Sequence, residues 1–159
     1  MMRPKFRYVY NREVKDWLHA ITREATMQNF KPAAIIAPNR GGLALGVMLS
    51  HYYDAPLFPI QLSHRDADIV DVIDIADGLK DGWRKGPILV IDDINDTGKT
   101  LQTIKRVAAE TPLAGEIRYA VLLEKQSSKE SADLVGSYID EEQDEQWVVF
   151  PWEDWWIRA

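Results

Sequence analysis

Residues 88 to 101 read Ile-Leu-Val-Ile-Asp-Asp-Ile-Asn-Asp-Thr-Gly-Lys-Thr-Leu. The four apolar residues at 88–91 predict a short buried strand, which is expected to end at two adjacent carboxylates, Asp92 and Asp93. The segment 96–100 contains small and hydrogen-bonding residues and leads into a predicted helix. A turn of this kind offers backbone N–H groups to an oxyanion, and paired acids suit vicinal hydroxyls or a divalent cation. The stretch therefore predicts a site for a ligand with the shape of a sugar phosphate.

Helices and strands alternate on both sides of this stretch. A helix with Asn11 as its N-cap runs to Ala25 with apolar residues at helical spacing. The remaining expected elements are strands at 33–37, 57–62, 117–123 and 134–139, and helices at 43–53 and 100–110. Pro59 marks its strand as an edge or an irregular end. This alternation predicts an α/β fold, a mainly parallel central sheet flanked by helices, with ligands at the carboxyl ends of the strands. The length of 159 residues predicts a single domain, 1–159.

The acidic segment at approximately 63–86 interrupts the alternation. Its apolar residues keep helical spacing, but its second half contains three glycines, at 78, 82 and 86. An amphipathic helix and a pair of mobile strands both remain open. In either case the segment is expected to leave the sheet and to serve as a lid.

Composition narrows the class of protein. Hydrophobic residues make up 46% and charged residues 28%, as in ordinary globular proteins. There is no apolar run of the roughly 18 residues that span a membrane, and no apolar segment after the basic start that would predict a signal peptide. The absence of cysteine excludes disulfides and fits a cytoplasmic location. A net charge of −6 argues against a general nucleic-acid partner.

Three common nucleotide and metal motifs do not fit. A Walker loop needs Gly five residues before the Gly98-Lys99 pair, but Asp93 stands there. The glycines at 41, 42 and 46 have the wrong spacing for a dinucleotide fingerprint. The acidic segment lacks the Gly of a calcium loop and has Val70 at a ligand position.

Residues 88–100 resemble the signature of the type I phosphoribosyltransferases, which bind phosphoribosyl pyrophosphate (PRPP). Residues 35–43 (Ile-Ile-Ala-Pro-Asn-Arg-Gly-Gly-Leu) resemble the pyrophosphate loop of the bacterial xanthine-guanine enzymes. A third similarity, to the purine pocket of the xanthine-guanine and hypoxanthine-guanine branch, comes from Lys125, from Trp147-Val148 and from residues 151–154. The resemblance implies the type I phosphoribosyltransferase fold. In that fold a small hood, approximately 124–159, is built from terminal segments, and 63–86 is the mobile lid.

The same resemblance implies where PRPP binds. Asp92 and Asp93 match the acids beside the ribose hydroxyls and a magnesium ion. The 5-phosphate loop is matched by Asp96, Thr97, Gly98, Lys99 and Thr100. The pyrophosphate loop is matched by Asn39, Arg40, Gly41 and Gly42, whose backbone often adopts a strained or cis form in the family.

Residues for the base follow by position in the same way. Asp96 matches the general base toward purine N7, and Lys125 matches the lysine that binds the 6-oxo group. Trp147 matches the aromatic residue that stacks on the base, and Val148 supplies backbone for the position-2 edge. Asp154 or its neighbour Glu153 is the candidate ligand of a second magnesium ion, although the favoured interpretation of either residue is an exposed acid at a helix start.

The implied function is purine salvage: transfer of 5-phosphoribosyl from PRPP to N9 of guanine, xanthine or hypoxanthine, with Mg²⁺, in a homodimer or homotetramer. Three alternatives remain: a phosphoribosyltransferase for another base, a regulator that senses PRPP or a nucleotide, and an inactive subunit of an assembly. The sequence departs from the family at His64 after Ser63, at Asn39 in place of Ser, and at Gln126 after the lysine. These departures concern lid behaviour and the choice of base more than the type of reaction.

Overall fold

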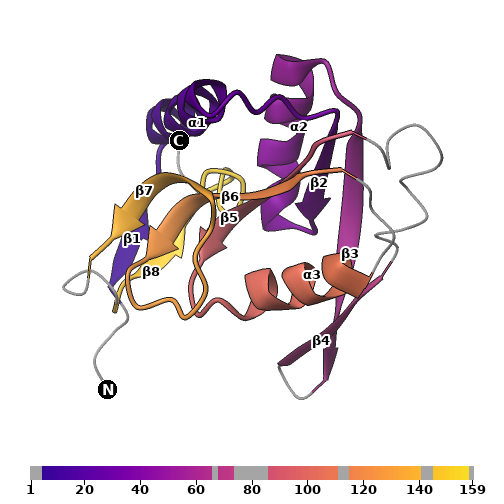
Figure 1. Ribbon diagram of the computed structural model, residues 1–159. Helices are drawn as coiled ribbons and strands as arrows, with labels where there is room; N and C mark the ends of the chain where they lie inside the picture. Colours follow the sequence, from indigo (N-terminus) through magenta and orange to yellow (C-terminus); the bar gives the residue numbers. More distant parts are fainter. Residues whose placement is uncertain (1–4, 66–67, 74–85, 111–114, 141–144, 158–159) are drawn as a thin grey trace.

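The computed structural model describes residues 5–65, 68–73, 86–110, 115–140 and 145–157. These form an α/β fold with helices on both faces of a central sheet (Figure 1). The elements in chain order are β1 (Phe6–Tyr8), α1 (Asn11–Met27), β2 (Ala34–Pro38), α2 (Gly41–Tyr53), β3 (Leu57–Arg65), β4 (Asp68–Ile73), β5 (Ile88–Asn95), α3 (Lys99–Glu110), β6 (Ile117–Lys125), β7 (Leu134–Ile139) and β8 (Trp147–Val149).

The central sheet has six strands in the order β4-β3-β2-β5-β6-β7. Every neighbouring pair is parallel except β3 with β4. Helices α1 and α2 cover one face and α3 covers the other (Figure 1). Strand β2 is buried along its whole length, as expected for a strand of a sheet with both faces covered. The predicted fold class, a mainly parallel sheet flanked by helices, is confirmed.

A crevice follows from this topology. Strand β2 continues into α2 on one face, whereas its neighbour β5 continues into α3 on the other face (Figure 1). Connections that leave adjacent strands toward opposite faces separate the two strand ends, and ligands bind at such a point. The ladder between β2 and β5 ends at Ile36 and Val90, whereas β5 stays paired with β6 as far as Asn95. The last residues of β5 therefore have an open side toward β2.

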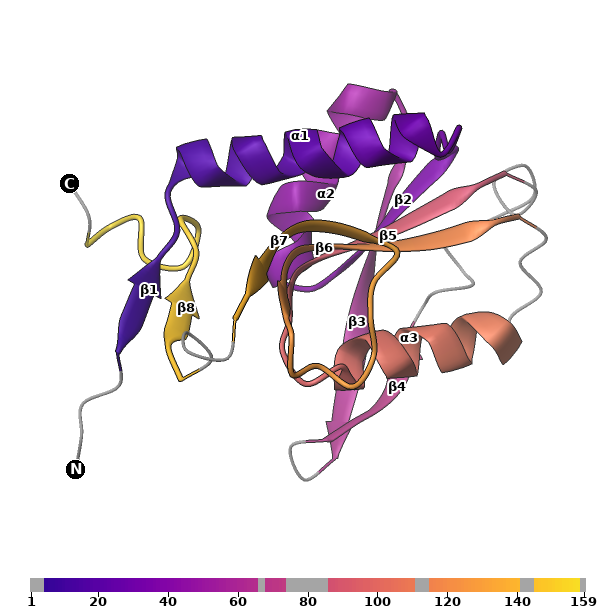
Figure 2. The same ribbon diagram turned by 60° about the vertical axis from the view of Figure 1, so that its left-hand side comes forward.

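A separate two-stranded parallel sheet joins β1 to β8. Phe6 pairs with Trp147 and Tyr8 with Val149. The pair lies beside the start of α1, next to the segment that follows β8 (Figure 2). Segments near the two ends of the chain thus meet in the part of the molecule that the resemblance assigns to the hood.

The structure corrects several expected boundaries. The N-cap of α1 is Tyr10, not Asn11, because the Glu13 carboxylate accepts a hydrogen bond from the Tyr10 N–H at 2.9 Å. Helix α2 begins two residues earlier than predicted, at Gly41. Strand β5 does not end before the two acids but runs through them, since β6 continues to pair with it.

The acidic segment begins as a hairpin. Strand β3 extends to Arg65 and pairs antiparallel with β4, so the strand alternative is correct for 68–73. Residues 66–67 and 74–85 lie outside the described residues, and the lid at 63–86 remains a prediction. In the described part of the sheet, β4 pairs with β3 only from Gln61 onward, so Pro59 stands where β3 is an edge. Pro59 needs no partner on that side, as its position predicted.

Candidate active site

Two half-buried carboxylates, Asp92 and Asp93, occupy the open side of β5. The N–H of Asp93 donates to Asp92 Oδ1 at 2.9 Å, and the N–H of Ile94 donates to Asp93 Oδ1 at 2.8 Å. Burial raises the pKa of Asp92 well above its usual range, and the charge of Asp93 raises it further. Burial also raises the pKa of Asp93, to about 6, and the charge of Glu153 adds to this increase. Two acids held this way favour a cation or hydroxyl donors beside them.

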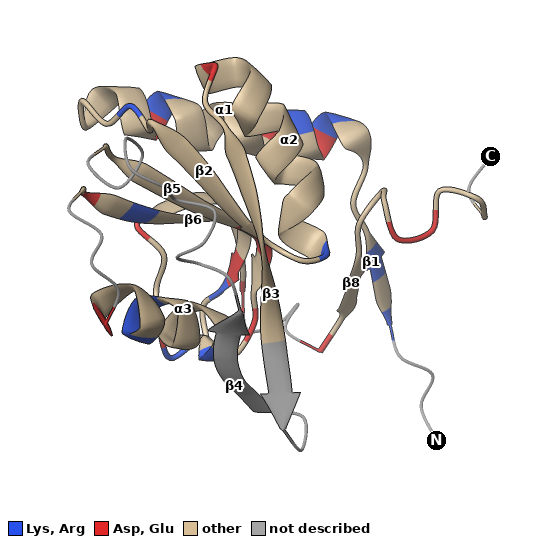
Figure 3. Ribbon diagram, turned by 90° about the vertical axis from the view of Figure 1, so that its right-hand side faces the viewer, with Lys and Arg blue, Asp and Glu red and all other residues tan. Residues whose placement is uncertain are grey.

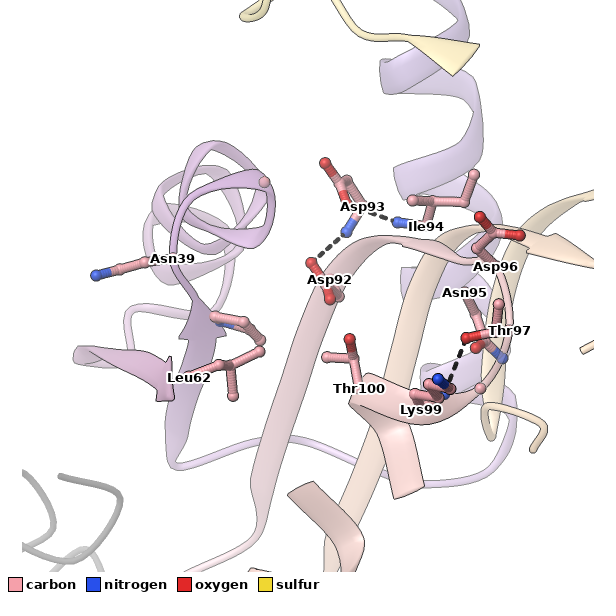
Figure 4. A pocket seen from close by; sticks show the side chains of 13 residues that line it. Asn39, Leu62, Asp92, Asp93, Ile94, Asn95, Asp96, Thr97, Lys99 and Thr100 are labelled. Carbon is pink, nitrogen blue, oxygen red and sulfur yellow. Dashed lines mark hydrogen bonds between the residues drawn. The ribbon is translucent and has the colours of Figure 1, made fainter. Parts of the chain in front are cut away.

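The predicted phosphate turn lies directly after these acids. Residues 96–100 line a cavity of about 310 Å³ together with Asp92, Asp93 and the end of β2 (Figure 4). Helix α3 starts within the turn, at Lys99, whose N–H is 3.4 Å from Thr97 Oγ1. The cavity therefore combines carboxylates on one wall with the N-terminus of a twelve-residue helix on another.

Gly98 shapes this turn. Its φ is +88°, and a Cβ at this position would lie 2.8 Å from the backbone N of Glu130. We expect Gly98→Ala to lower the free energy of unfolding by about 2 kcal/mol, because an L-residue is strained at this φ and the neighbouring loop must shift. Urea denaturation measures the effect, with exposed Lys129→Ala as control. Equal stability of wild type and Gly98→Ala would contradict this account of the turn.

The predicted pyrophosphate loop faces Asp93 across the crevice. The peptide bond between Asn39 and Arg40 is cis, as the resemblance implied. A Cβ on Gly41 would overlap the Asp93 carboxylate, and one on Gly42 would lie 2.5 Å from the Ile91 carbonyl oxygen. Because Gly41 and Gly42 have no Cβ, the backbone at the start of α2 lies directly against the end of β5.

The expected base residues lie on the other side of Asp93. Lys125 Nζ is 2.8 Å from Asp96 Oδ1; the Lys125 side chain is 13% exposed and that of Asp96 58%. Both line a cavity of about 150 Å³ that Trp147 and Val148 also line. The Trp147 side chain is 65% exposed. Strand β8, held by β1, carries Trp147 to this cavity.

A third cavity, of about 610 Å³, lies between the Asn39–Gly41 loop and the segment after β8, with Trp152, Glu153 and Trp156 on that side. Asp93 lines all three cavities. Acidic segments lie near the end of β5, behind β3, and on the segment after β8 (Figure 3). The three predicted groups of residues thus meet around one carboxylate.

Asp154 is not part of this arrangement. It is buried, with 8% exposure, and lines none of the three cavities, whereas Glu153 lines two of them. The Glu153 Oε2 accepts a hydrogen bond from the Phe150 N–H at 2.7 Å, an acid holding the start of a turn. The expected metal-ligand role of Asp154 therefore lacks geometric support in the described residues.

Sequence patterns did not single out some residues of the site. Trp156 lines the cavity of about 610 Å³. Trp152, which belongs to the predicted segment 151–154, lines it too and stacks on Phe150 with ring centroids 5.0 Å apart. Asn95 and Glu124 form a buried hydrogen bond beneath the site. The signal for this bond was a polar residue at the end of each of two neighbouring strands.

Comparison with known proteins agrees with this geometry. The phosphoribosyl transferase domain family matches residues 9–155. A xanthine-guanine phosphoribosyltransferase of Desulfotalea psychrophila is 29% identical over 124 residues, which cover 75% of this chain and 69% of that protein.

Two solved structures are similar over nearly their whole length. One is a purine phosphoribosyltransferase from Pyrococcus horikoshii, with 27% identity, a TM-score of 0.71 and coverage of 94% of this chain and 95% of that one. The other is the xanthine-guanine-hypoxanthine phosphoribosyltransferase of Helicobacter pylori, with 25% identity, a TM-score of 0.75 and coverage of 96% and 95%. No helix among the described residues is both long and apolar enough to cross a bilayer. Since the family match spans almost the entire chain and the fold agrees, the chain belongs to the phosphoribosyltransferase family and is a transferase of that type.

Proposed function

We propose that this enzyme transfers the 5-phosphoribosyl group of PRPP to N9 of a 6-oxopurine, releasing pyrophosphate. The observation that carries the proposal is the Lys125–Asp96 pair, which is 2.8 Å apart and adjoins the phosphate turn. O6, an acceptor, and N7 lie side by side on one edge of a 6-oxopurine, and N7 carries a proton in the tautomer whose N9 attacks. A lysine donating to O6 beside a carboxylate that meets an N7–H matches that edge. Adenine, with an amino group at position 6, offers no acceptor to Lys125.

Each of the three cavities suits one part of the two substrates: the 5-phosphate of PRPP, its pyrophosphate, or the purine base. The 5-phosphate is assigned to the 96–100 turn, where helix α3 begins. Pyrophosphate is assigned to the Asn39–Gly42 loop at the start of α2. The base is assigned to the cavity lined by Lys125, with Trp147 stacking on it and Val148 backbone at its position-2 edge. Asp92 and Asp93 then lie between the phosphates, beside the ribose hydroxyls.

The chemistry follows from these positions. The bond from N9 to the ribose carbon C1 forms as the bond from C1 to the pyrophosphate oxygen breaks, and the electron pair leaves with pyrophosphate. Asp96 accepts the N7 proton as the base attacks, a general-base role. Positive charge that develops on the ribose ring is stabilised by the nearby carboxylates Asp92 and Asp93.

The acids fit a magnesium ion shared with the substrate. Among the described residues, no three His, Cys, Asp or Glu side chains gather as metal ligands. Mg²⁺ commonly takes one or two carboxylates and completes its shell with substrate oxygens and water, which matches Asp92 and Asp93. When bound, the ion supplies neutralising charge for the leaving pyrophosphate. For a second magnesium ion, Glu153 is a better candidate ligand than Asp154. Glu153 lines the cavity assigned to pyrophosphate, whereas Asp154 is buried and does not.

Lys125→Met should raise KM for an oxopurine by about 10- to 100-fold, the worth of one hydrogen bond from a charged donor. The affinity for PRPP should change little, because Lys125 lines the base cavity and not the phosphate cavity. Initial rates at saturating PRPP measure the first quantity and calorimetry the second. Lys129→Met, an exposed lysine on the next loop, is the control. An unchanged KM for every oxopurine would contradict the O6 contact.

The proposed function is tested by pyrophosphate release with PRPP, Mg²⁺ and a panel of guanine, xanthine, hypoxanthine, adenine and orotate. We expect turnover with at least one oxopurine and a kcat/KM for adenine at least about 100-fold lower, as expected when a buried donor is left unpaired. Turnover only with adenine or orotate would assign another base to the enzyme. No release with any base would refute the function.

A further inference from the structure

Two buried polar side chains lie side by side where β5 and β6 end. Asn95 and Glu124 are partners in the parallel ladder, and they are only 4% and 6% exposed. The Asn95 Nδ2 donates to Glu124 Oε2 at 2.9 Å. Polar groups buried in a sheet cost free energy unless every donor and acceptor finds a partner. A polar pair at this depth therefore marks a position where directed contacts replace apolar packing.

The loop 126–132, which follows β6, supplies the remaining partners. The Asn95 Nδ2 also donates to the Glu130 carbonyl oxygen at 2.6 Å. The single hydroxyl hydrogen of Ser128 is shared between two acceptors, Asn95 Oδ1 at 3.1 Å and the Glu130 carbonyl oxygen at 2.9 Å from Oγ. The N–H of Ala132 donates to Glu124 Oε2 at 2.8 Å. Asn95 and Glu124 thus tie the loop to both strand ends.

The same loop contacts the phosphate turn. The Lys129 N–H is 3.4 Å from the Thr97 carbonyl oxygen, and Gly98 lies against Glu130 so closely that a Cβ would be 2.8 Å from its backbone N. Lys105 of α3 reaches the Glu130 carboxylate at 2.6 Å. A displacement of this loop would therefore be transmitted to the turn and to the helix that starts there.

The base-facing pair lies on the other side of the same strand ends. Asp96 follows Asn95 and Lys125 follows Glu124, and successive side chains along an extended chain point in opposite directions. Asn95 and Asp96 leave the end of β5 on opposite sides in Figure 4. The buried Asn95–Glu124 hydrogen bond and the Asp96–Lys125 pair, which are 2.8 Å apart, therefore lie on opposite sides of the ends of β5 and β6.

We propose that Asn95, Glu124 and Ser128 are positioning residues: they hold the Asp96–Lys125 pair at a set place relative to the phosphate turn. The inference rests on the proposed function, because it concerns the alignment of base and ribose. None of the three is required to touch the reacting atoms. Their effect is on alignment, and a misplacement of about 1 Å can cost about 100-fold in rate.

Asn95→Asp tests the Asn95–Glu124 hydrogen bond with almost no change in the shape of the side chain. A second carboxylate would face Glu124, and the like charges would push the strand ends apart. We expect kcat/KM for the oxopurine to fall about 10- to 100-fold, with the loss mainly in kcat. The Kd for PRPP alone should change less, by no more than about 3-fold, because the substitution leaves the residues of the turn unchanged and reaches the turn only through the loop.

Rescue separates positioning from general damage. In Asn95→Asp with Glu124→Gln, the glutamine amide can donate to the new carboxylate, so we expect recovery of at least about 5-fold. Glu124→Gln alone keeps an acceptor oxygen and should stay within about 3-fold of wild type. Ser131→Ala, on the same loop with an exposed side chain, is the control, and thermal unfolding of each variant verifies its fold.

Ser128→Ala keeps the test decisive if Asn95→Asp does not fold. It removes one donor to Asn95 and should lower kcat/KM by about 3- to 10-fold, with Ser128→Thr restoring the rate. Wild-type rates for Asn95→Asp and Ser128→Ala, or losses that neither Glu124→Gln nor Ser128→Thr relieves, would overturn the inference. A wild type without turnover overturns the proposed function and this inference with it, whereas an active wild type with unimpaired variants overturns the inference alone.

Discussion

Asp96→Asn is expected to lower kcat by roughly 10²- to 10⁴-fold, the usual contribution of a general base. Asparagine has nearly the same size as aspartate and retains an oxygen that can accept a hydrogen bond from Lys125 Nζ. In the wild type this nitrogen lies 2.8 Å from Asp96 Oδ1. The substitution removes the carboxylate that we propose accepts the N7 proton. The Kd for PRPP should therefore change by no more than about 3-fold, because only the proton acceptor is lost.

Single-turnover rates at saturating PRPP and base measure this effect, and calorimetry with PRPP measures binding. Asp16→Asn removes the same charge from an exposed position on α1, where Asp16 lies 3.9 Å from Arg12, and should leave both quantities unchanged. If Asp96→Asn loses binding and turnover in equal proportion, Asp96 binds substrate instead of accepting the proton.

Asp93→Asn should stabilise the ligand-free protein while it destroys activity. The Asp93 pKa is raised to about 6 by burial, so its ionised form costs the folded state free energy at neutral pH. Removing that charge should raise the free energy of unfolding at pH 7 by about 1 to 3 kcal/mol. Because Asp93 borders all three cavities, kcat/KM for PRPP should fall by at least about 100-fold, the worth of a lost charged contact.

The stabilisation has a defined pH dependence. The folded pKa lies above the ordinary value of 3.8, so the charge penalty is complete above pH 6 and absent below about pH 4, where both states are protonated. The advantage of Asp93→Asn in urea denaturation should grow as pH rises between these limits. Glu116→Gln, an exposed acid paired with Arg118, is the control. An advantage independent of pH would contradict a buried charge as its source.

The fold class and the residues at the strand ends were predictable because they depend on local pattern. Four apolar residues before Asp92 predict a strand, and the small and hydrogen-bonding residues at 96–100 predict a turn suited to phosphate, both within one short segment. The boundary at Asp92 was wrong, since pairing with β6 carries β5 on to Asn95. Ladder partners from a distant part of the chain decide how far a strand extends, and no local pattern shows them.

The residues proposed to bind the purine base were harder to predict from the sequence. Lys125 and Trp147 were assigned only through resemblance, because a lysine or tryptophan alone has no distinctive spacing. That Lys125 meets Asp96 depends on the parallel register of β5 and β6, and that Trp147 reaches the cavity depends on β1. Asp154 and Glu153 are adjacent acids, and burial alone distinguishes them, which a sequence does not reveal.

The β1–β8 sheet has a consequence for the order in which the molecule is built during translation. Phe6 and its partner Trp147 are 141 residues apart in the sequence (147 − 6), so Phe6 is synthesised well before Trp147. At synthesis rates of about 5 to 20 residues per second, β1 waits several seconds or longer for β8. The strands that carry Asp92 and the phosphate turn are complete before then. The residues proposed to bind ribose and phosphate are therefore in place in a nascent chain before Trp147, which is proposed to stack on the purine.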